Sequence, residues 1–279
     1  MATKKRRKRR KRRRCNTSSV ARWQRWWRRL KRWLRRRRYW LLVVLCVALT
    51  ALVSTPLLYD YVVNLFAEER MEYSSSYADY DGIDVSKYQG DIDWYQVSIN
   101  PHVKFVYIKA TEGASHVDKR YQENLRKARA VGLRVGSYHF FTSQRSPEDQ
   151  IRNFLKYVKH EEQDLLPMVD VEHTGNRLAE RRQLQNNLAK FMELVKAEYG
   201  KYPLLYSQYK FYNDMLAPEF NRHFIFIARY SNYQPTLRGG GKYNIWQFTE
   251  NGHVNGIKGN VDLNRFANGT SIKDILLKK

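Results

Sequence analysis

The sequence is poor in cysteine: only Cys15 and Cys46 occur in 279 residues. Two cysteines exclude a disulfide-stabilised scaffold and any site that binds a metal through four thiolates. The chain also lacks the G-x-S-x-G turn of serine hydrolases and the H-E-x-x-H motif of zinc proteases. No internal repeat is present. We therefore expect a globular protein that uses neither a metal nor a cofactor.

Acidic residues are missing from residues 1–38, which contain 21 of the 51 lysines and arginines. The other 241 residues hold 30 basic and 27 acidic residues, so the net charge of +24 falls to +3 outside this arm. A charge of +24 is by itself typical of nucleic-acid binding. Its confinement to one end instead predicts a basic arm joined to a nearly neutral domain.

Charged residues are also missing from residues 39–59, an apolar run long enough to cross a bilayer as a helix. The basic flank before it predicts a cytoplasmic N-terminus, with the chain after about residue 60 exported. A cleavable signal peptide is the alternative, but no A-x-A site follows the apolar run. We expect an uncleaved anchor, a linker over 60–80, and a single-pass protein of the cytoplasmic membrane whose domain at 81–279 faces the periplasmic or extracellular side.

Within the basic arm, large apolar side chains recur at helical spacing. On a helix they form one stripe surrounded by Arg and Lys: Trp23, Trp26, Trp27, Leu30, Trp33 and Leu34. This composition is typical of a helix in the membrane interface, where cations meet anionic lipid. Binding of nucleic acid through phosphate neutralisation is the alternative, which we do not favour because topology and lipid contact already account for the charge.

Short apolar runs alternate with helical patterns through the exported domain. The predicted strands are 82–86, 104–110, 134–140, 165–171, 203–207, 223–228, 243–248 and 261–265. The predicted helices are 92–98, 119–131, 147–160, 177–199 and 208–215. Five βα units followed by three strands predict an α/β fold of the TIM-barrel type, (β/α)5β3, and an open doubly wound sheet is the alternative.

Acidic residues stand near the ends of four predicted strands: Asp84, Glu112, the pair Asp170 and Glu172, and Asp262. If the strands run parallel, their C-terminal ends form the catalytic face of the barrel. Asp170 and Glu172 are two apart on one strand and so point the same way. Like charges held close raise at least one pKa, as general-acid catalysis near neutral pH requires.

Aromatic residues accompany these acids near strand ends, among them Tyr138, Tyr206, Tyr230 and Trp246. Aromatic faces beside carboxylates suit sugar rings, which offer apolar C–H faces and hydroxyl edges. Periodicity alone does not separate such a role from packing in the core.

Eight motifs occur in one order over 81–268: GIDVSKYQGDIDW (82–94), FVYIKATEG (105–113), GLRVGSYHFF (132–141), PMVDVE (167–172), LYS (205–207), ARY (228–230), IWQF (245–248) and GNVDLNRF (259–266). Together they closely resemble the glycoside hydrolase family 25 lysozymes, the Chalaropsis-type muramidases. The resemblance implies a (β/α)5β3 barrel that hydrolyses the β-1,4 bond between N-acetylmuramic acid and N-acetylglucosamine in peptidoglycan.

The resemblance also implies roles for single residues. Glu172 would be the general acid, and Asp170 would orient the 2-acetamido group of the substrate or act as the second catalytic carboxylate. Asp84 and Asp262 would hold that pair and the sugar in place. The remaining matches are to substrate-binding positions of the groove: Tyr138, Tyr206, Tyr230, Trp246 and Gln247. We add Glu112 to this substrate-binding set.

Two alternatives to this function are set against it. The family 18 chitinases use D-x-x-D-x-D-x-E, but this chain has Leu165 and Met168 where that motif has aspartate. A non-catalytic peptidoglycan-binding module would not need the retained acids of the D-x-E motif. We therefore expect a membrane-anchored muramidase whose partners are glycan strands and lipid.

Overall fold

The computed structural model describes residues 22–33 and 79–278. Residues 22–33 form a helix on which Trp23 and Trp27 meet edge to face, with ring centroids 6.1 Å apart. Within these described ranges no helix combines the length and apolarity needed to cross a membrane. The predicted anchor at 39–59 lies outside the described residues, as does nearly all of the predicted linker.

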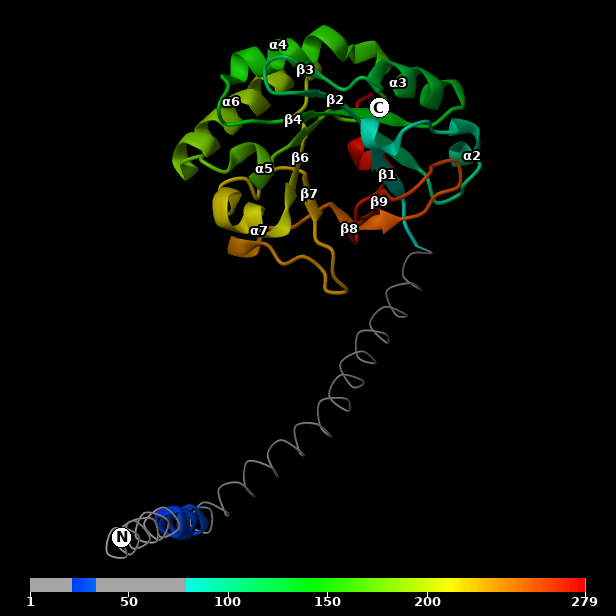
Figure 1. The fold of residues 1–279 in the computed structure, drawn as a ribbon. Coiled ribbons are helices and arrows are strands. Elements are labelled where there is room, and N and C mark those ends of the chain that lie inside the picture. Colours follow the sequence, from blue (N-terminus) through cyan, green and yellow to red (C-terminus); the bar gives the residue numbers. More distant parts are fainter. Residues whose placement is uncertain (1–21, 34–78, 279) are drawn as a thin grey trace, which may run out of the picture. The chain divides into compact units, whose positions relative to one another are not determined.

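Eight strands of the second part close into a barrel (Figure 1). They are β1 (Gly82–Val85), β2 (Phe105–Glu112), β4 (Val135–Phe140), β5 (Met168–Asp170), β6 (Leu204–Gln208), β7 (Ile225–Ala228), β8 (Ile245–Gly252) and β9 (Val261–Phe266). The two-residue β3 (His116–Val117) pairs with the end of β2. Because β1 pairs with both β2 and β9, the sheet is closed, which confirms the barrel and excludes the open sheet.

Strand direction differs from the expectation at one place. Among the eight barrel strands, the pairs that join β1, β2 and β4 through β8 are parallel, whereas β9 runs antiparallel to both β8 and β1. The assumption that all eight strands run parallel is therefore wrong for β9. Only a short connection separates β8 from β9, and such a connection allows a hairpin but no crossover.

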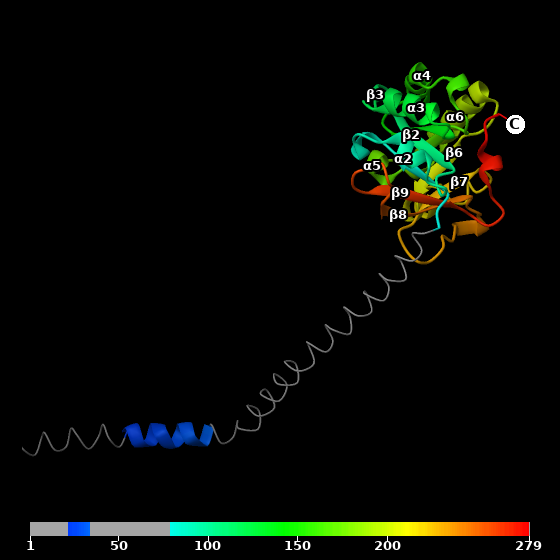
Figure 2. The same cartoon turned by 90° about the vertical axis from the view of Figure 1, so that its right-hand side faces the viewer.

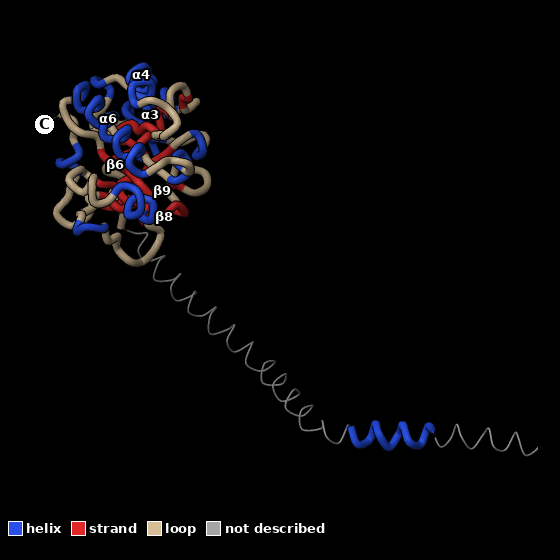
Figure 3. Tube along the Cα trace, turned by 90° about the vertical axis from the view of Figure 1, so that its left-hand side faces the viewer, coloured by secondary structure: helices blue, strands red, loops and turns tan. Residues whose placement is uncertain are grey.

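Helices and short turns surround the strands, as Figures 2 and 3 show. The α-helices are α2 (Trp94–Ser98), α3 (Tyr121–Ala130), α4 (Pro147–Tyr157), α5 (His173–Asn176), α6 (Arg181–Tyr199) and α7 (Tyr209–Phe211). The short helical turns are η1 (Lys87–Gln89), η2 (His160–Glu162), η3 (Tyr212–Leu216), η4 (Arg238–Gly240) and η5 (Ile272–Ile275). All five predicted helical regions contain a helix, which completes the (β/α)5β3 pattern.

Local sequence signals set the ends of the two main helices. Ser146 caps α4, accepting a hydrogen bond from the backbone N–H of Asp149 at 3.1 Å, and Pro147 occupies the first turn. Glu180 caps α6 by accepting from two backbone N–H groups, so this helix begins at Arg181 rather than at the predicted 177. It ends at Gly200, whose φ of 73° suits glycine.

Aromatic rings fill the barrel at the end where β1 and β2 begin. Phe105 and Tyr107 point inward from β2, and the Tyr107 hydroxyl donates to the backbone oxygen of Leu166 at 2.9 Å. Glycines make room for these rings: a Cβ on Gly82 would lie 2.6 Å from the Phe105 ring, and one on Gly136 would lie 2.4 Å from the Tyr107 ring. The barrel is therefore closed at this level.

Candidate active site

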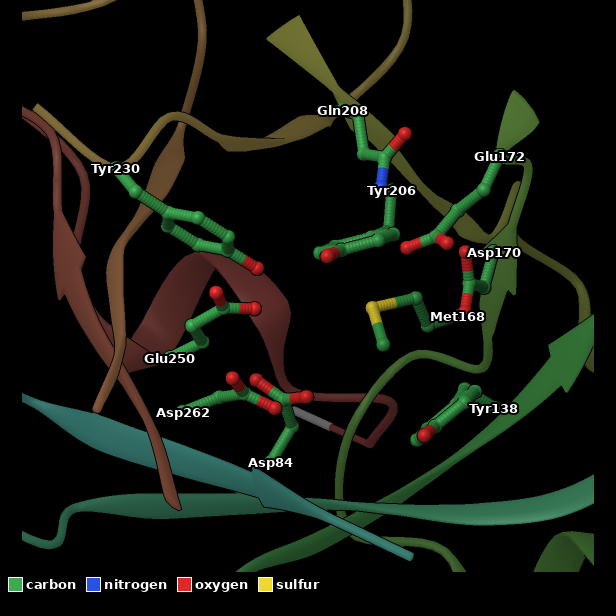
Figure 4. Close-up of a pocket in the computed structure, with 10 residues that line it drawn as sticks. All are labelled: Asp84, Tyr138, Met168, Asp170, Glu172, Tyr206, Gln208, Tyr230, Glu250 and Asp262. Atoms are coloured by element: carbon green, nitrogen blue, oxygen red, sulfur yellow. The ribbon is translucent and has the colours of Figure 1, made fainter. Parts of the chain in front are cut away.

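A polar pocket of about 210 Å³ lies at the mouth of the barrel formed by the C-terminal ends of the parallel strands (Figure 4). Its lining is Asp84, Tyr138, Met168, Asp170, Glu172, Tyr206, Gln208, Tyr230, Glu250 and Asp262. Asp262 is the second residue of β9 and not near its end. It reaches this mouth because β9 runs antiparallel, which brings the start of β9 beside the end of β1.

Asp170 and Glu172 lie side by side at one edge of the pocket (Figure 4). Asp170 is buried, and its Oδ1 has no hydrogen-bond partner in the described chain. Burial and the negative charge of Glu172 raise the pKa of Asp170 well above its ordinary value. Burial also raises the pKa of Glu172, although the nearby hydroxyl of Tyr206 opposes this shift. The pair therefore retains a proton nearer to neutral pH than free carboxyls do.

The segment that carries this pair is held by its own hydrogen bonds. Ser207 on β6 donates its hydroxyl to the backbone oxygen of Val171 at 2.7 Å. Asn176 on α5 donates its amide to the backbone oxygen of Glu172 at 2.8 Å. The backbone between the two acids and at Glu172 is thus tied to neighbouring elements, which restricts the direction in which their side chains point.

Asp84 and Asp262 form a second carboxyl pair on the other side of the pocket (Figure 4). They are direct partners across β1 and β9. Burial and the charge of Asp84 raise the pKa of Asp262 to about 9, so Asp262 is protonated at neutral pH and donates to Asp84. Asp84 Oδ2 also accepts from the side-chain amides of Gln247 and Asn264, each at 2.9 Å. These three donors favour the ionised form of Asp84, against the effect of burial.

The side-chain amide of Gln247 links Asp84 to two tyrosines of the pocket. Its Oε1 accepts from the hydroxyls of Tyr206 at 2.9 Å and Tyr230 at 2.7 Å, while its Nε2 donates to Asp84. Gln247 is 1% exposed and so lies behind the pocket surface. It therefore orients three pocket residues without lining the pocket itself.

The structure brings seven of the ten residues singled out in the sequence into the pocket lining: Asp84, Tyr138, Asp170, Glu172, Tyr206, Tyr230 and Asp262. Three are elsewhere. Gln247 is behind the wall, Trp246 is buried and donates its indole N–H to the backbone oxygen of Arg229 at 2.8 Å, and Glu112 forms an ion pair with Lys109 at 2.8 Å.

Sequence reasoning missed three residues of the lining. Met168 and Gln208 each stand two positions from a selected residue on the same strand, so strand alternation could have found them. Glu250 carries no such signal, because a bulge in β8 interrupts the alternation between Gln247 and Thr249.

Paired carboxyls with raised pKa values, set among tyrosines in the mouth of an α/β barrel, are the machinery of a glycoside hydrolase. The sequence profile of glycosyl hydrolases family 25 matches residues 83–257, which include Asp84, Asp170 and Glu172. The chain belongs to this family, and it is a hydrolase of the lysozyme type.

Individual relatives agree with this family. The uncharacterized protein YegX of Escherichia coli is 36% identical over 193 residues, 68% of this chain and 70% of that protein. The autolytic lysozyme of Clostridium acetobutylicum is 30% identical over 188 residues, 67% of this chain and 56% of that protein. A solved family 25 glycosyl hydrolase from Bacillus anthracis is 32% identical, with a TM-score of 0.63 over 70% of this chain and 92% of that one.

Proposed function

We propose that this protein is a muramidase that hydrolyses the β-1,4 bond between N-acetylmuramic acid and N-acetylglucosamine in peptidoglycan. The family and the lysozyme named among its relatives support this substrate. The observation that carries the proposal is the pair of Asp170 and Glu172, in which a buried oxygen without a partner lies beside a carboxyl that faces the pocket. A substrate that offers a glycosidic oxygen and a nearby N–H group satisfies both.

In the proposed reaction Glu172 gives its proton to the glycosidic oxygen as the bond from that oxygen to C1 breaks. Asp170 Oδ1 accepts a hydrogen bond from the N–H of the 2-acetamido group. The carbonyl oxygen of that group attacks C1 and forms a cyclic intermediate. Water then attacks C1 and transfers a proton to Glu172, which opens the ring and restores the acid. In the alternative, Asp170 itself is the second catalytic carboxylate.

The other pocket residues have supporting roles in this proposal. Asp84 and Asp262 share one proton and one negative charge across from the catalytic pair, and their other carboxyl oxygens accept hydrogen bonds from sugar hydroxyls and so hold the sugar in place. The rings of Tyr138, Tyr206 and Tyr230 offer faces and hydroxyls to the substrate. Gln247 acts from behind this surface by orienting Tyr206, Tyr230 and Asp84. Trp246 and Glu112, also expected to bind substrate, lie outside the lining.

Substitution of Glu172 by Gln tests the proposal. We expect Glu172→Gln to abolish the release of reducing ends from purified peptidoglycan while thermal unfolding shows an intact fold, because Gln cannot donate a proton to the leaving oxygen. Glu198→Gln, an exposed change on α6, is the matched control and should cleave normally. Undiminished cleavage by Glu172→Gln would remove this residue from the mechanism. Wild-type protein that binds peptidoglycan and never cleaves it would indicate a binding module instead.

We further propose that residues 39–59 anchor the protein in the cytoplasmic membrane, with the N-terminus inside and the barrel outside. The absence of charge over 39–59 and the 21 basic residues before it support this orientation. The exposed Trp23, Trp26 and Trp33 on the helix at 22–33 support contact of the arm with anionic lipid.

Protease treatment of intact spheroplasts tests the topology. The barrel should be digested or released while an epitope placed at residue 1 survives until the membrane is permeabilised. Digestion of the epitope in intact spheroplasts would contradict the orientation. Recovery of the full chain in the supernatant after cell breakage and high-speed sedimentation would contradict the anchor.

A further inference from the structure

Glu250 enters the pocket because β8 contains an extra residue. Gln247 lies opposite Asn264 on β9 and Thr249 lies opposite Leu263, so the register shifts between these two pairs, and it shifts again between Thr249 and Gly252. One extra residue inverts the alternation of inward and outward side chains. Glu250 lies in this irregular stretch of β8, and its carboxyl points into the pocket from the wall facing Glu172 (Figure 4).

Among the residues that the structure describes, no side chain forms a hydrogen bond or an ion pair with Glu250. The neighbouring acids differ in this respect. Asp84 accepts from two amides, Asp262 donates to Asp84, and Glu172 has the hydroxyl of Tyr206 nearby, which lowers its pKa against the effect of burial. Glu250 is also exposed, so water solvates its charge until a ligand displaces that water.

The pocket supplies no positive charge to balance this carboxylate. Five of its ten lining residues are acidic, and none is Lys, Arg or His. The nearby Lys109 is already held by Glu112 at 2.8 Å and lies over the Phe140 ring at 4.5 Å. A substrate that brings a cation to Glu250 gains an attraction, whereas a neutral substrate must desolvate the carboxylate for one hydrogen bond.

We propose that Glu250 is a specificity-determining residue that makes this enzyme favour substrates with a primary ammonium group beside the cleaved bond. The inference rests on the proposed muramidase function and names the chemistry that its substrate carries. Two parts of peptidoglycan offer such a group: an amino sugar that has lost its N-acetyl group, and a free amine on a stem peptide. Both present the same N–H donors and the same charge.

Two pairs of peptidoglycan substrates distinguish these sources. In the first pair all stem-peptide amines are acetylated, and the sugars are either fully N-acetylated or partly de-N-acetylated. In the second pair all sugars are N-acetylated, and the stem amines are either free or acetylated. We compare kcat/KM for release of reducing ends by full-length wild type, Glu250→Gln and the remote control Glu198→Gln. Glutamine keeps the acceptor oxygen of Glu250 and removes its charge.

We expect wild type and Glu198→Gln to favour the amine form by about fivefold in one of the two pairs, as for a partly exposed charge pair. In Glu250→Gln this preference should fall to about one. A wild type without any preference for the amine form, or an unchanged preference in Glu250→Gln, would overturn the proposal.

A binding measurement separates this inference from the proposed function. Glu172→Gln and the double variant Glu172→Gln with Glu250→Gln are titrated with a glucosamine tetramer, an N-acetylglucosamine tetramer, and an amine-bearing muropeptide with its acetylated form. A preference for an amine form that requires Glu250 supports the inference even if wild type cleaves no peptidoglycan. No such preference in either set overturns it even if wild type cleaves well.

Discussion

The buried amide of Gln247 orients three side chains of the active site at once. Two tyrosine hydroxyls donate to its oxygen, and its nitrogen donates to Asp84. Such an arrangement is directional because an amide has its acceptor and its donors at opposite ends. Loss of this group would release Tyr206 and Tyr230 and remove one donor from a buried carboxylate, although no atom of Gln247 lines the pocket.

Gln247→Leu should therefore lower kcat/KM on peptidoglycan by about tenfold to a hundredfold, the usual effect of removing a group that orients active-site residues. The apolar side chain of Leu keeps the volume but leaves both tyrosine hydroxyls without their acceptor. Steady-state kinetics with circular dichroism as the folding check measures this effect. Gln122→Leu, on the exposed face of α3, is the control. Wild-type kinetics in Gln247→Leu would show that the tyrosines need no such support.

Lys109 is a cation on β2 that acts on the pair of Asp170 and Glu172. Its positive charge lowers the pKa of both Asp170 and Glu172, in opposition to burial. The pH profile of kcat/KM reports the titration of the pair as a whole. Lys109→Met removes a charge that favours ionisation, so both limbs of the profile should move to higher pH, whereas Lys109→Arg should leave them in place. An unmoved profile in Lys109→Met would show that solvent screens this charge completely.

At the scale of the elements, periodicity predicts which segments are strands but not how they run or where they are irregular. Apolar runs located all eight strands of the barrel, and Ser146 with Pro147 located the start of α4. The antiparallel direction of β9 has no signal in its own residues, since Asp262 and Asn264 alternate alike in either direction. The side of the wall on which Trp246 and Gln247 lie depends on barrel curvature, and the inward turn of Glu250 depends on a bulge.

The cap of α4 supplies a prediction at this scale. Ser146→Ala removes the acceptor for the backbone N–H of Asp149 and should lower the free energy of unfolding by about 1 kcal/mol. Urea denaturation measures the change, and Ser146→Thr should retain most of the stability. Cleavage of peptidoglycan should stay normal in both, because Ser146 does not line the pocket. An equal loss in Ser146→Thr would point to a role other than capping.

For the molecule as a whole, the active site lowers stability at neutral pH. Asp84, Asp170, Glu172 and Asp262 all have raised pKa values in the folded protein. The folded state therefore binds more protons than the unfolded state above about pH 4, and the stability these groups provide is lost as pH rises through their folded pKa values. For Asp262 that window extends to about pH 9.

Asp170→Asn should consequently raise the free energy of unfolding at pH 7 by about 0.5–2 kcal/mol while cleavage is lost. The gain should shrink toward pH 4, where the native aspartate is already protonated. Urea titrations at the two pH values measure the difference, with Glu198→Gln as a control that should show no gain. A loss of stability at pH 7 in Asp170→Asn would mean that the charge of Asp170 is better solvated than its burial implies.

The aromatic rings below the pocket determine how a polymer can enter the enzyme. Because Phe105 and Tyr107 fill the barrel against Gly82 and Gly136, nothing can thread through it, and the pocket has a single opening. A glycan strand can then reach the pocket only from the mouth, and we expect it to lie across that mouth with both of its ends free in solution. Such a binding mode needs no chain terminus, so the enzyme should cut within strands at any exposed disaccharide and shorten long polymers from the first turnover.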